Sequence, residues 1–411
     1  MFSRRTAWRL TENDFTRAIS SHRAAGRELL DLTVSNPTVA GLRYDGQAIL
    51  AALANSAALT YTPNPKGLFS ARAAVAGYYR QMASAIGHDE LEKKKEEEKE
   101  EDAAVDPESV VLTVSSSEAY SFLFRLLCDP GDEVLIPRPS YPLFEYLAEL
   151  HDARLAPYSL FYDHGWHIDV HSLRVALTAR SRAIIVVHPN NPTGSYVHPQ
   201  ETAQLNALCA AHNLALVADE VFFDYSLREQ DGTGPRSFAF NRDALTFTLN
   251  GVSKISGLPQ MKLAWIVTGG PRELAEPALE RLEVIADTYL SMNAPIQLAA
   301  PALLDQRHSI REQLVARMHA NLVELDRQLQ TQSLCSRLEV EGGWYAMLRA
   351  PATRSDEELA IALLERTNVL AQPGYFYDFP QEGYLVLSLI APESDFQEGL
   401  RRILGFVQEA L

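Results

Sequence analysis

Short apolar runs alternate with longer amphipathic stretches through the middle of the chain, from residue 110 to residue 267. Short apolar runs bounded by turn-forming residues are typical of buried strands, and the stretches between them have the length and periodicity of helices. This alternation predicts an α/β fold with a mostly parallel central sheet. The expected strands are Val110–Val114, Glu133–Ile136, Arg154–Pro157, Ala183–Val187, Leu214–Ala218, Leu245–Leu249 and Ala264–Val267.

After residue 267 the pattern changes to long amphipathic stretches. A helical region covers residues 273–330, with an interruption at Asn293-Ala-Pro295. Beyond it the apolar runs are short again and predict a second, smaller α+β unit. Its expected elements are strands at Leu338–Val340, Trp344–Leu348 and Tyr384–Ile390 and a helix at Asp356–Arg366.

The composition is that of a globular protein. The chain has 411 residues, 46% of them hydrophobic. No apolar run approaches the ~20 residues that span a bilayer, so we expect no membrane partner. The formal net charge of −16 argues against a nucleic-acid partner, because a phosphate backbone needs a basic face. Cys128, Cys209 and Cys335 show no paired spacing and the N-terminus has no secretory pattern, so we expect a reducing, cytoplasmic location and no metal site.

One segment is dominated by charge. Glu90 to Asp102 contains eight acids and four lysines, which contribute −4 of the net −16. Such a run cannot bury apolar surface and is usually a solvated helix end or a disordered loop. We interpret it as an insertion between two elements of the fold and assign it no chemistry.

Lys254 is the first candidate for chemistry. It lies between small and hydroxyl residues, five positions after the end of the apolar run at Leu249. A lysine at the end of a core strand must either reach water or have a lowered pKa. A neutral, desolvated amine is a nucleophile suited to Schiff-base chemistry with a carbonyl. On spacing alone, Lys254 could equally cap a strand at the surface.

Further segments follow the ends of predicted strands, and their order along the chain is informative. They are Ser115-Ser-Ser117, Pro139-Ser-Tyr141, Asn191-Pro-Thr-Gly194, Asp219-Glu220 and Ser253-Lys254. The same order resembles the conserved segments of fold type I pyridoxal-phosphate (PLP) enzymes, the class I/II aminotransferase family. The resemblance covers the chain from about Leu29 to its end.

The resemblance implies a fold, a cofactor and a partner. It implies a large domain with a mostly parallel, seven-stranded sheet, a smaller α+β domain, bound pyridoxal 5'-phosphate and a homodimer. The implied boundaries are 1–47 for an N-terminal segment of the small domain, 48–295 for the large domain and 296–411 for the small C-terminal domain.

The resemblance also implies a phosphate site. Ser115, Ser116 and Ser117 would open a helix whose free N–H groups and dipole bind the phosphate, although they could also form an ordinary helix cap. Ser253 and Lys262 would complete the site, with lysine where the family most often has arginine. Tyr61, contributed by the partner subunit, would reach the same phosphate, unless it is a packed aromatic before a loop.

Around the cofactor ring, the resemblance implies four further roles. Tyr141 would stack on the ring, Asp219 would pair with its nitrogen and Asn191 would donate to its phenolic oxygen. Lys254 would form the internal aldimine and then shuttle a proton. Phe222 stands where the family often has a tyrosine, and the loss of that hydroxyl should raise the aldimine pKa.

The chain departs from the family at the substrate carboxylate. Val386 occupies the position of the arginine that usually binds this group, and a valine cannot bind a carboxylate. Asn36, Lys66 and Arg349 are candidates to replace it, and Trp344 is a candidate for the wall of a lipophilic pocket.

The function implied is amino-group transfer between an amino acid, or a related amine, and a 2-oxo acid. The alternatives are a PLP-dependent lyase, cyclase or oxidase of specialised biosynthesis, made more plausible by Val386 and Phe222, and a catalytically silent homologue.

Overall fold

The computed structural model describes residues 1–8, 10–86, 104–142, 144–228 and 235–409. Its centre is an eight-stranded sheet. In spatial order the strands are β2 (Val110–Thr113), β9 (Ala264–Gly269), β8 (Thr246–Gly251), β7 (Ala215–Asp219), β6 (Ser181–Val187), β3 (Glu133–Arg138), β4 (Arg154–Tyr162) and β5 (Trp166–Ile168).

The sheet is mostly parallel, which confirms the α/β prediction. The neighbours β8, β7, β6, β3 and β4 run in one direction, and β9 runs against both β8 and β2. The prediction of seven strands was one short, because β5 returns antiparallel along the edge of β4. At three residues, β5 is too short to show a strand periodicity of its own.

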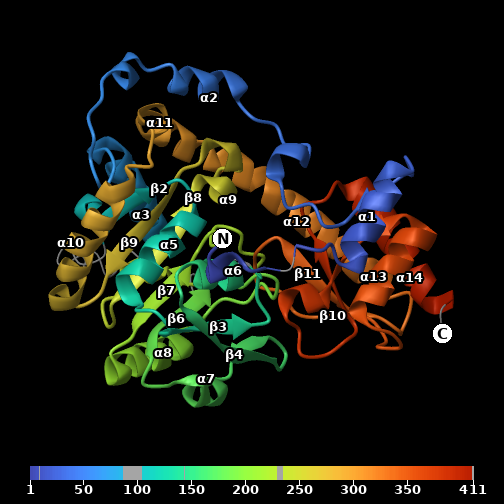
Figure 1. Ribbon diagram of the computed structural model, residues 1–411. Helices are drawn as coiled ribbons and strands as arrows, with labels where there is room; N and C mark the ends of the chain where they lie inside the picture. The colour runs from blue at the N-terminus through green and yellow to red at the C-terminus, as the bar shows by residue number, and fades with distance from the viewer. Residues whose placement is uncertain (9, 87–103, 143, 229–234, 410–411) are drawn as a thin grey trace, which may run out of the picture.

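Helices cover both faces of this sheet (Figure 1). On one face α5 (Ser116–Leu127), α6 (Phe144–Leu150) and α10 (Arg272–Tyr289) share a core with one set of strand side chains. On the other face α7 (Val170–Ala176) and α8 (Pro199–His212) pack against the alternate set. Successive residues of a strand point to opposite faces, so the continuous apolar runs are explained by burial on both sides.

A third core lies at the β2 and β9 end of the sheet. It contains side chains of α2 (Gly46–Leu53), α3 (Phe69–Ile86) and α11 (Ala294–Asp305). The predicted domain boundary at 295–296 therefore falls inside a helix that packs on α2 and α3.

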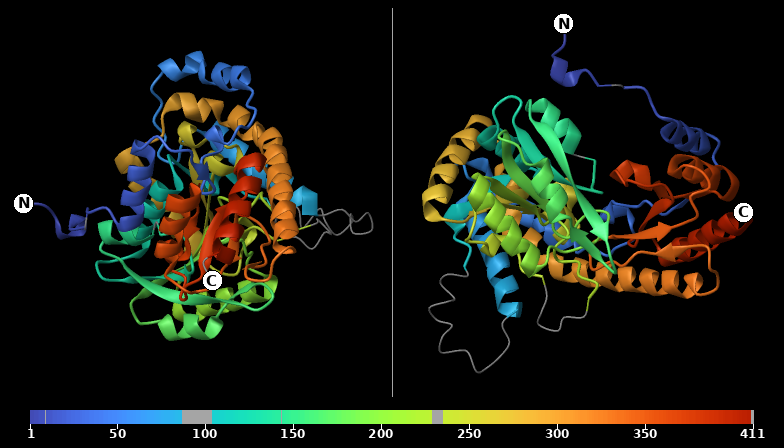
Figure 2. Two further views of the ribbon diagram at one scale, coloured as in Figure 1. Left: turned by 90° about the vertical axis from the view of Figure 1, so that its right-hand side faces the viewer. Right: turned by 90° about the horizontal axis from the view of Figure 1, so that it is seen from below.

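A second body is built on a four-stranded antiparallel sheet. Its strands in order are β10 (Ser336–Arg337), β11 (Tyr345–Arg349), β14 (Tyr384–Ser388) and β13 (Gln372–Pro373). The helices α13 (Asp356–Thr367) and α14 (Glu393–Glu409) pack in its core, and α12 (Arg307–Leu329) runs to it from the larger body (Figures 1 and 2).

The N-terminal segment lies against this second body (Figure 1). Its strand β1 (Leu30–Asp31) pairs in parallel with β12 (Val369–Leu370), and α1 (Asp14–Ala24) packs on α13. Residues more than three hundred positions apart in the sequence thus share one small sheet.

Two sequence expectations concern what surrounds the fold. Within the residues that the structure describes, no helix is long and apolar enough to cross a membrane. The charged insertion predicted at Glu90–Asp102 lies outside the described residues.

Candidate active site

The predicted site segments meet at one edge of the large sheet. Strands β6, β7 and β8 are parallel neighbours, so their carboxyl ends lie side by side. Asn191 follows β6, Asp219 ends β7 and Lys254 follows β8. Carboxyl ends of parallel strands are where α/β folds gather ligands. The structure therefore brings the three predicted ring and lysine positions to a common edge.

Lys254 lies in a one-turn helix, α9 (Val252–Ile255), that starts directly after β8. Gly251 makes this turn possible, because a Cβ there would lie 2.9 Å from the carbonyl oxygen of Leu263. Burial lowers the pKa of the Lys254 amine to about 8, and the carboxylate of Asp219 partly offsets this. The amine thus has the pKa that a group exchanging protons near neutrality requires.

Aromatic side chains surround Lys254. Its Nζ atom lies over the ring of Trp344, 4.8 Å from the centroid, and over that of Phe222, 5.4 Å from the centroid. Tyr225 donates its hydroxyl to the backbone carbonyl of Lys254 at 2.6 Å. This hydroxyl is therefore committed to the main chain and does not replace the one absent from Phe222.

Asp219 is buried at the end of β7. Its Oδ2 accepts a hydrogen bond from the hydroxyl of Tyr120 at 2.9 Å, and its Oδ1 accepts one from the N–H of Val221 at 3.2 Å. Burial raises the pKa of this carboxyl to about 6, against the effect of both hydrogen bonds. A cation placed beside it would reverse the shift, which is what a protonated ring nitrogen provides.

Tyr120 is a site residue that sequence reasoning missed. It lies on α5, in the turn after Ser117, with no exposed surface. In the sequence it is one aromatic in an apolar helix, and nothing local links it to Asp219. The only signal was its place in the helix that starts with the predicted phosphate site.

The loop after β6 is fixed by its own side chains. The carboxamide oxygen of Asn190 accepts hydrogen bonds from the hydroxyl of Thr193 at 3.0 Å and from its N–H at 3.3 Å. Asn191 differs, because its Oδ1 is buried and has no hydrogen-bond partner among the described residues. Its carboxamide is thus left available to a ligand.

The three serines open α5 directly after β2. Ser115 is the N-cap, and its hydroxyl accepts a hydrogen bond from the N–H of Glu118 at 3.2 Å. The helix-cap interpretation therefore describes the Ser115 side chain in this structure. Ser116 and Ser117 lie in the first turn, partly exposed, where the N–H groups have no partner within the helix. Such a turn favours an anion.

The remaining phosphate candidates are less enclosed. Ser253 is partly buried beside Lys254, whereas Lys262 is exposed and adopts a left-handed conformation with φ of 51°. Tyr141 follows β3 and is 43% exposed. Tyr61 is 80% exposed in the single chain.

The substrate candidates are not brought together. The carboxamide oxygen of Asn36 accepts hydrogen bonds from the N–H and the hydroxyl of Thr38, so it caps a local turn. Lys66 bonds to Glu108 at 2.6 Å. Arg349 ends β11, roughly 16 Å along the strand from Trp344.

Trp344 and Val386 are both interior residues. Trp344 has no exposed surface, and its ring contacts the Lys254 amine and the rings of Phe222 and Tyr225. Val386 is 1% exposed and lies opposite Met347 in the small sheet.

The residues at this edge fit PLP. This edge carries a buried carboxylate, a carboxamide whose oxygen has no partner among the described residues, and a desolvated amine. The helix α5 joins them through the hydrogen bond from Tyr120 to Asp219. These are the groups needed for a ring nitrogen, a phenolic oxygen, an aldehyde and a phosphate.

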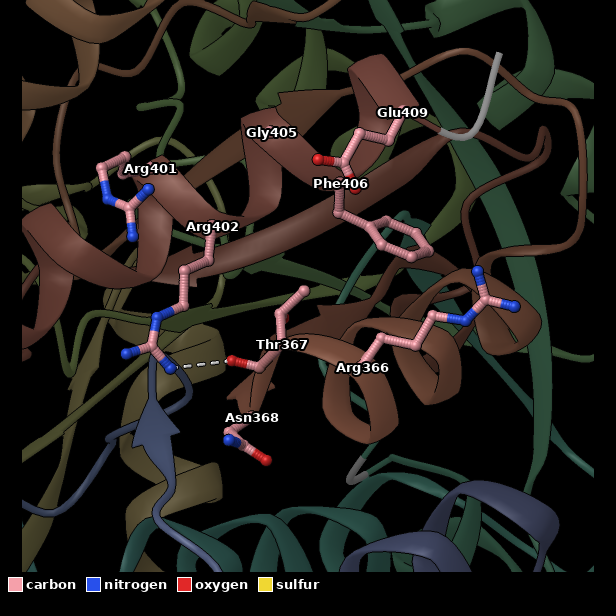
Figure 3. Close-up of a pocket in the computed structure, with 8 residues that line it drawn as sticks. All are labelled: Arg366, Thr367, Asn368, Arg401, Arg402, Gly405, Phe406 and Glu409. Carbon is pink, nitrogen blue, oxygen red and sulfur yellow. Dashed lines mark hydrogen bonds between the residues drawn. The ribbon is translucent and has the colours of Figure 1, made fainter.

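A cavity lies elsewhere, on the surface of the second body (Figure 3). It measures about 500 Å³ and lies between the end of α13 and α14. Two of its arginines, Arg401 and Arg402, bond to Glu398, and Arg366 lies over the ring of Phe406. No predicted site residue lines it, so size alone does not locate the chemistry here.

Comparison with known proteins gives consistent matches. The family model "Aminotransferase class I and II" matches residues 27–403. A glutamate-pyruvate aminotransferase of Haemophilus influenzae is 24% identical over 395 residues, covering 93% of this chain and 92% of that protein. An alanine aminotransferase of Mycobacterium tuberculosis is 27% identical over 394 residues, covering 93% of this chain and 86% of that protein.

Solved structures share the fold. An aminotransferase from Escherichia coli superposes with a TM-score of 0.82 at 23% identity, over 99% of this chain and 98% of that one. An alanine aminotransferase from Pyrococcus furiosus gives a TM-score of 0.81 at 22% identity, over the full length of both chains.

Proposed function

Because the chain belongs to the class I and II aminotransferase family, and is thus a PLP-dependent enzyme that transfers amino groups, we propose that Lys254 is its cofactor-binding and proton-transferring lysine. The observation that carries this proposal is the position of Lys254 directly after β8, with its amine over the rings of Trp344 and Phe222. Burial lowers the pKa of this amine to about 8, and Asp219 acts on it in the opposite sense. A lysine of this kind can act as a nucleophile and as an acid and base near neutral pH.

The other site residues hold and orient the cofactor in this proposal. Bound PLP supplies an aldehyde and an electron-withdrawing ring. Asp219 keeps the ring nitrogen protonated, and Tyr120 orients that carboxylate through its hydroxyl. Asn191 donates to the phenolic oxygen, since its carboxamide can turn its NH₂ toward a ligand. Tyr141 packs on the ring.

The phosphate is held by two groups of donors. The first is the N-terminus of α5 with Ser115, Ser116 and Ser117, and the second is Ser253 with Lys262. A 12-residue helix aims its dipole at this point, and the hydroxyls add donors.

We propose that the substrates are an amino acid, or a related amine, and a 2-oxo acid. The relative named as a glutamate-pyruvate aminotransferase supports pyruvate as the first acceptor to test. The buried Val386 leaves the carboxylate without an arginine at that position. The donor screen should therefore include amines that have no α-carboxylate.

We also propose a homodimer in which Tyr61 of one chain reaches the phosphate of the other. Tyr61 and Leu59 are 80% and 90% exposed, and a cavity of about 210 Å³ beside them is lined in part by Leu290 and Met292. In this proposal, these side chains and the cavity form the surface that the partner subunit covers. Light scattering of the purified protein tests the dimer, and a loss of cofactor affinity in Tyr61→Phe tests the contact.

We propose a cytoplasmic location because the three cysteine thiols are free. Cys128, Cys209 and Cys335 are free, and burial raises the pKa of each thiol. Free, protonated thiols are what a reducing compartment maintains.

The deciding experiment is reduction of the PLP-loaded protein with borohydride, followed by peptide mass spectrometry. We expect the cofactor mass on the peptide that contains Lys254, and loss of turnover in a folded Lys254→Ala variant. A tag on another lysine, or no tag, would reject the assignment. With an amine donor alone, formation of pyridoxamine phosphate and a 2-oxo acid identifies transfer, whereas release of ammonia identifies elimination or oxidation.

A further inference from the structure

The Lys254 amine contacts two aromatic rings that also pack against each other. Nζ is 4.8 Å from the centroid of the Trp344 ring and 5.4 Å from that of Phe222. The two rings meet edge to face, with centroids 5.2 Å apart and planes at 68°. A cation over an aromatic face within about 6 Å is attracted by the ring, more strongly away from water.

Trp344 is fixed from a second side by Tyr225. These rings also meet edge to face at 5.2 Å, and neither has exposed surface. The hydroxyl of Tyr225 donates to the carbonyl of Lys254. The same aromatic cluster therefore contacts the amine and the backbone of one lysine.

The backbone before Trp344 keeps this cluster in register. A Cβ on Gly342 would lie 2.7 Å from the carbonyl oxygen of Tyr225, so only glycine permits the approach. Gly343 has a φ of 79°, a conformation that other residues rarely adopt.

We propose that Trp344 and Phe222 form an aromatic seat that stabilises the protonated form of the Lys254 amine when the amine has no covalent partner. This inference rests on the proposed role of Lys254. In that role, the amine released from the cofactor stays nearby and must carry a proton for part of each cycle before giving it back. Trp344 and Phe222 are then positioning residues. The observed contact involves no substrate.

One charged group near α9 also favours the protonated amine, and it stays in place in every variant tested below. From β7, Asp219 is the carboxylate that favours the charged amine, and in the proposed function it is engaged by the ring nitrogen. Asp224 accepts a hydrogen bond from Tyr78, and its carbonyl accepts one from Arg311 of α12. Lys262 is exposed beyond the next turn.

The test measures the protonation of Lys254 in the full chain freed of cofactor. Competitive acetylation with acetic anhydride across a pH series, read by mass spectrometry, gives the pKa of Lys254, with exposed Lys262 as the internal standard. We expect Trp344→Leu to lower the Lys254 pKa by about 0.5 to 1.5 units, because the ring face is lost. Trp344→Phe should give a smaller shift, and Tyr225→Phe none.

The sign of the shift separates this role from a purely structural one. A smaller side chain that only admitted water would raise the pKa, so an unchanged or raised value overturns the proposal. If Trp344→Leu fails to fold, Phe222→Leu makes the same test, with Phe222→Tyr as the variant that keeps a ring. Because the readout needs no cofactor, it is separate from the borohydride result on the proposed function.

Discussion

Tyr120 donates its hydroxyl to Oδ2 of Asp219 at 2.9 Å, so a neutral partner holds a carboxylate whose pKa burial raises to about 6. A raised pKa means that the folded, cofactor-free protein binds this proton more tightly than the unfolded chain does. The stability that the protonated group contributes is therefore present below about pH 4 and lost as the pH rises through about 6.

Asp219→Asn should remove the loss of stability that ionisation of Asp219 causes as the pH rises. The variant's gain in unfolding free energy should be small at pH 4.5 and about 3 kcal/mol at pH 8, measured by urea denaturation of the cofactor-free protein. Asp132→Asn is the contrast, because its carboxylate pairs with Arg182 at 2.8 Å and its loss should destabilise. Equal gains for Asp219→Asn at both pH values would contradict the expected pH dependence. With PLP present, Asp219→Asn should bind the cofactor more weakly.

Glu341 should prove to be a strong contact between the two bodies. Its Oε2 accepts the buried N–H of Tyr196 at 2.8 Å, and its Oε1 pairs with Arg228 at 2.5 Å. Glu341→Ala leaves that N–H without an acceptor, so we expect a loss of about 1 to 3 kcal/mol in urea denaturation. Glu341→Gln keeps an acceptor and should lose less.

The control for this prediction is Glu339→Ala. Glu339 is half exposed and pairs with Arg337 at 3.1 Å, so its removal should cost less than about 1 kcal/mol. Equal losses at Glu339 and Glu341 would mean that burial of the contact does not matter.

Gly194→Ala should destabilise the protein, and Gly77→Ala should not. Gly194 has a φ of 71°, and a Cβ there would lie 2.4 Å from the carbonyl oxygen of Gly342. We expect a loss of at least about 2 kcal/mol. Gly77 lies inside α3, and a Cβ added there would have no other atom within 4 Å, so alanine should stabilise by roughly 0.5 to 1 kcal/mol. Thermal melting of both variants gives the comparison, and a similar melting temperature for the two would refute it.

Phe222→Tyr should change the bound cofactor without changing the fold. In the proposed binding mode, a hydroxyl at this position would add a donor near the phenolic oxygen. It should then lower the pH midpoint of the cofactor's visible absorbance by about 1 unit. Spectrophotometric titration of the loaded protein measures the midpoint. An unchanged midpoint would indicate that the new hydroxyl does not reach the oxygen.

The sequence could predict the strands and the ends at which Asn191, Asp219 and Lys254 lie, because continuous apolar runs mark strands buried on both faces. It could not predict β5, which is defined by pairing with β4 and not by a pattern of its own. In the small sheet the strand expected at Leu338–Val340 lies at Ser336–Arg337, where pairing with β11 sets the register.

Side-chain partners were harder to predict than strand ends. Tyr120 meets Asp219 across 99 positions, and Trp344 meets Lys254 from the other body. By contrast, the carboxamide oxygen of Asn36 accepts a hydrogen bond from the N–H of Thr38, only two positions away. A local motif therefore predicts the residue types of a site, whereas the tertiary structure determines which of these residues are in contact.

The pairing of β1 with β12 has a consequence for how the chain forms during synthesis. Leu30 is synthesised more than three hundred residues before its strand partner Val369. All strands of the eight-stranded sheet have been synthesised once the chain reaches Gly269. This sheet can therefore fold while the segment around Leu30 still has no strand partner. A nascent chain stalled before residue 369 should therefore protect the large sheet from protease and leave the segment around Leu30 open to cleavage.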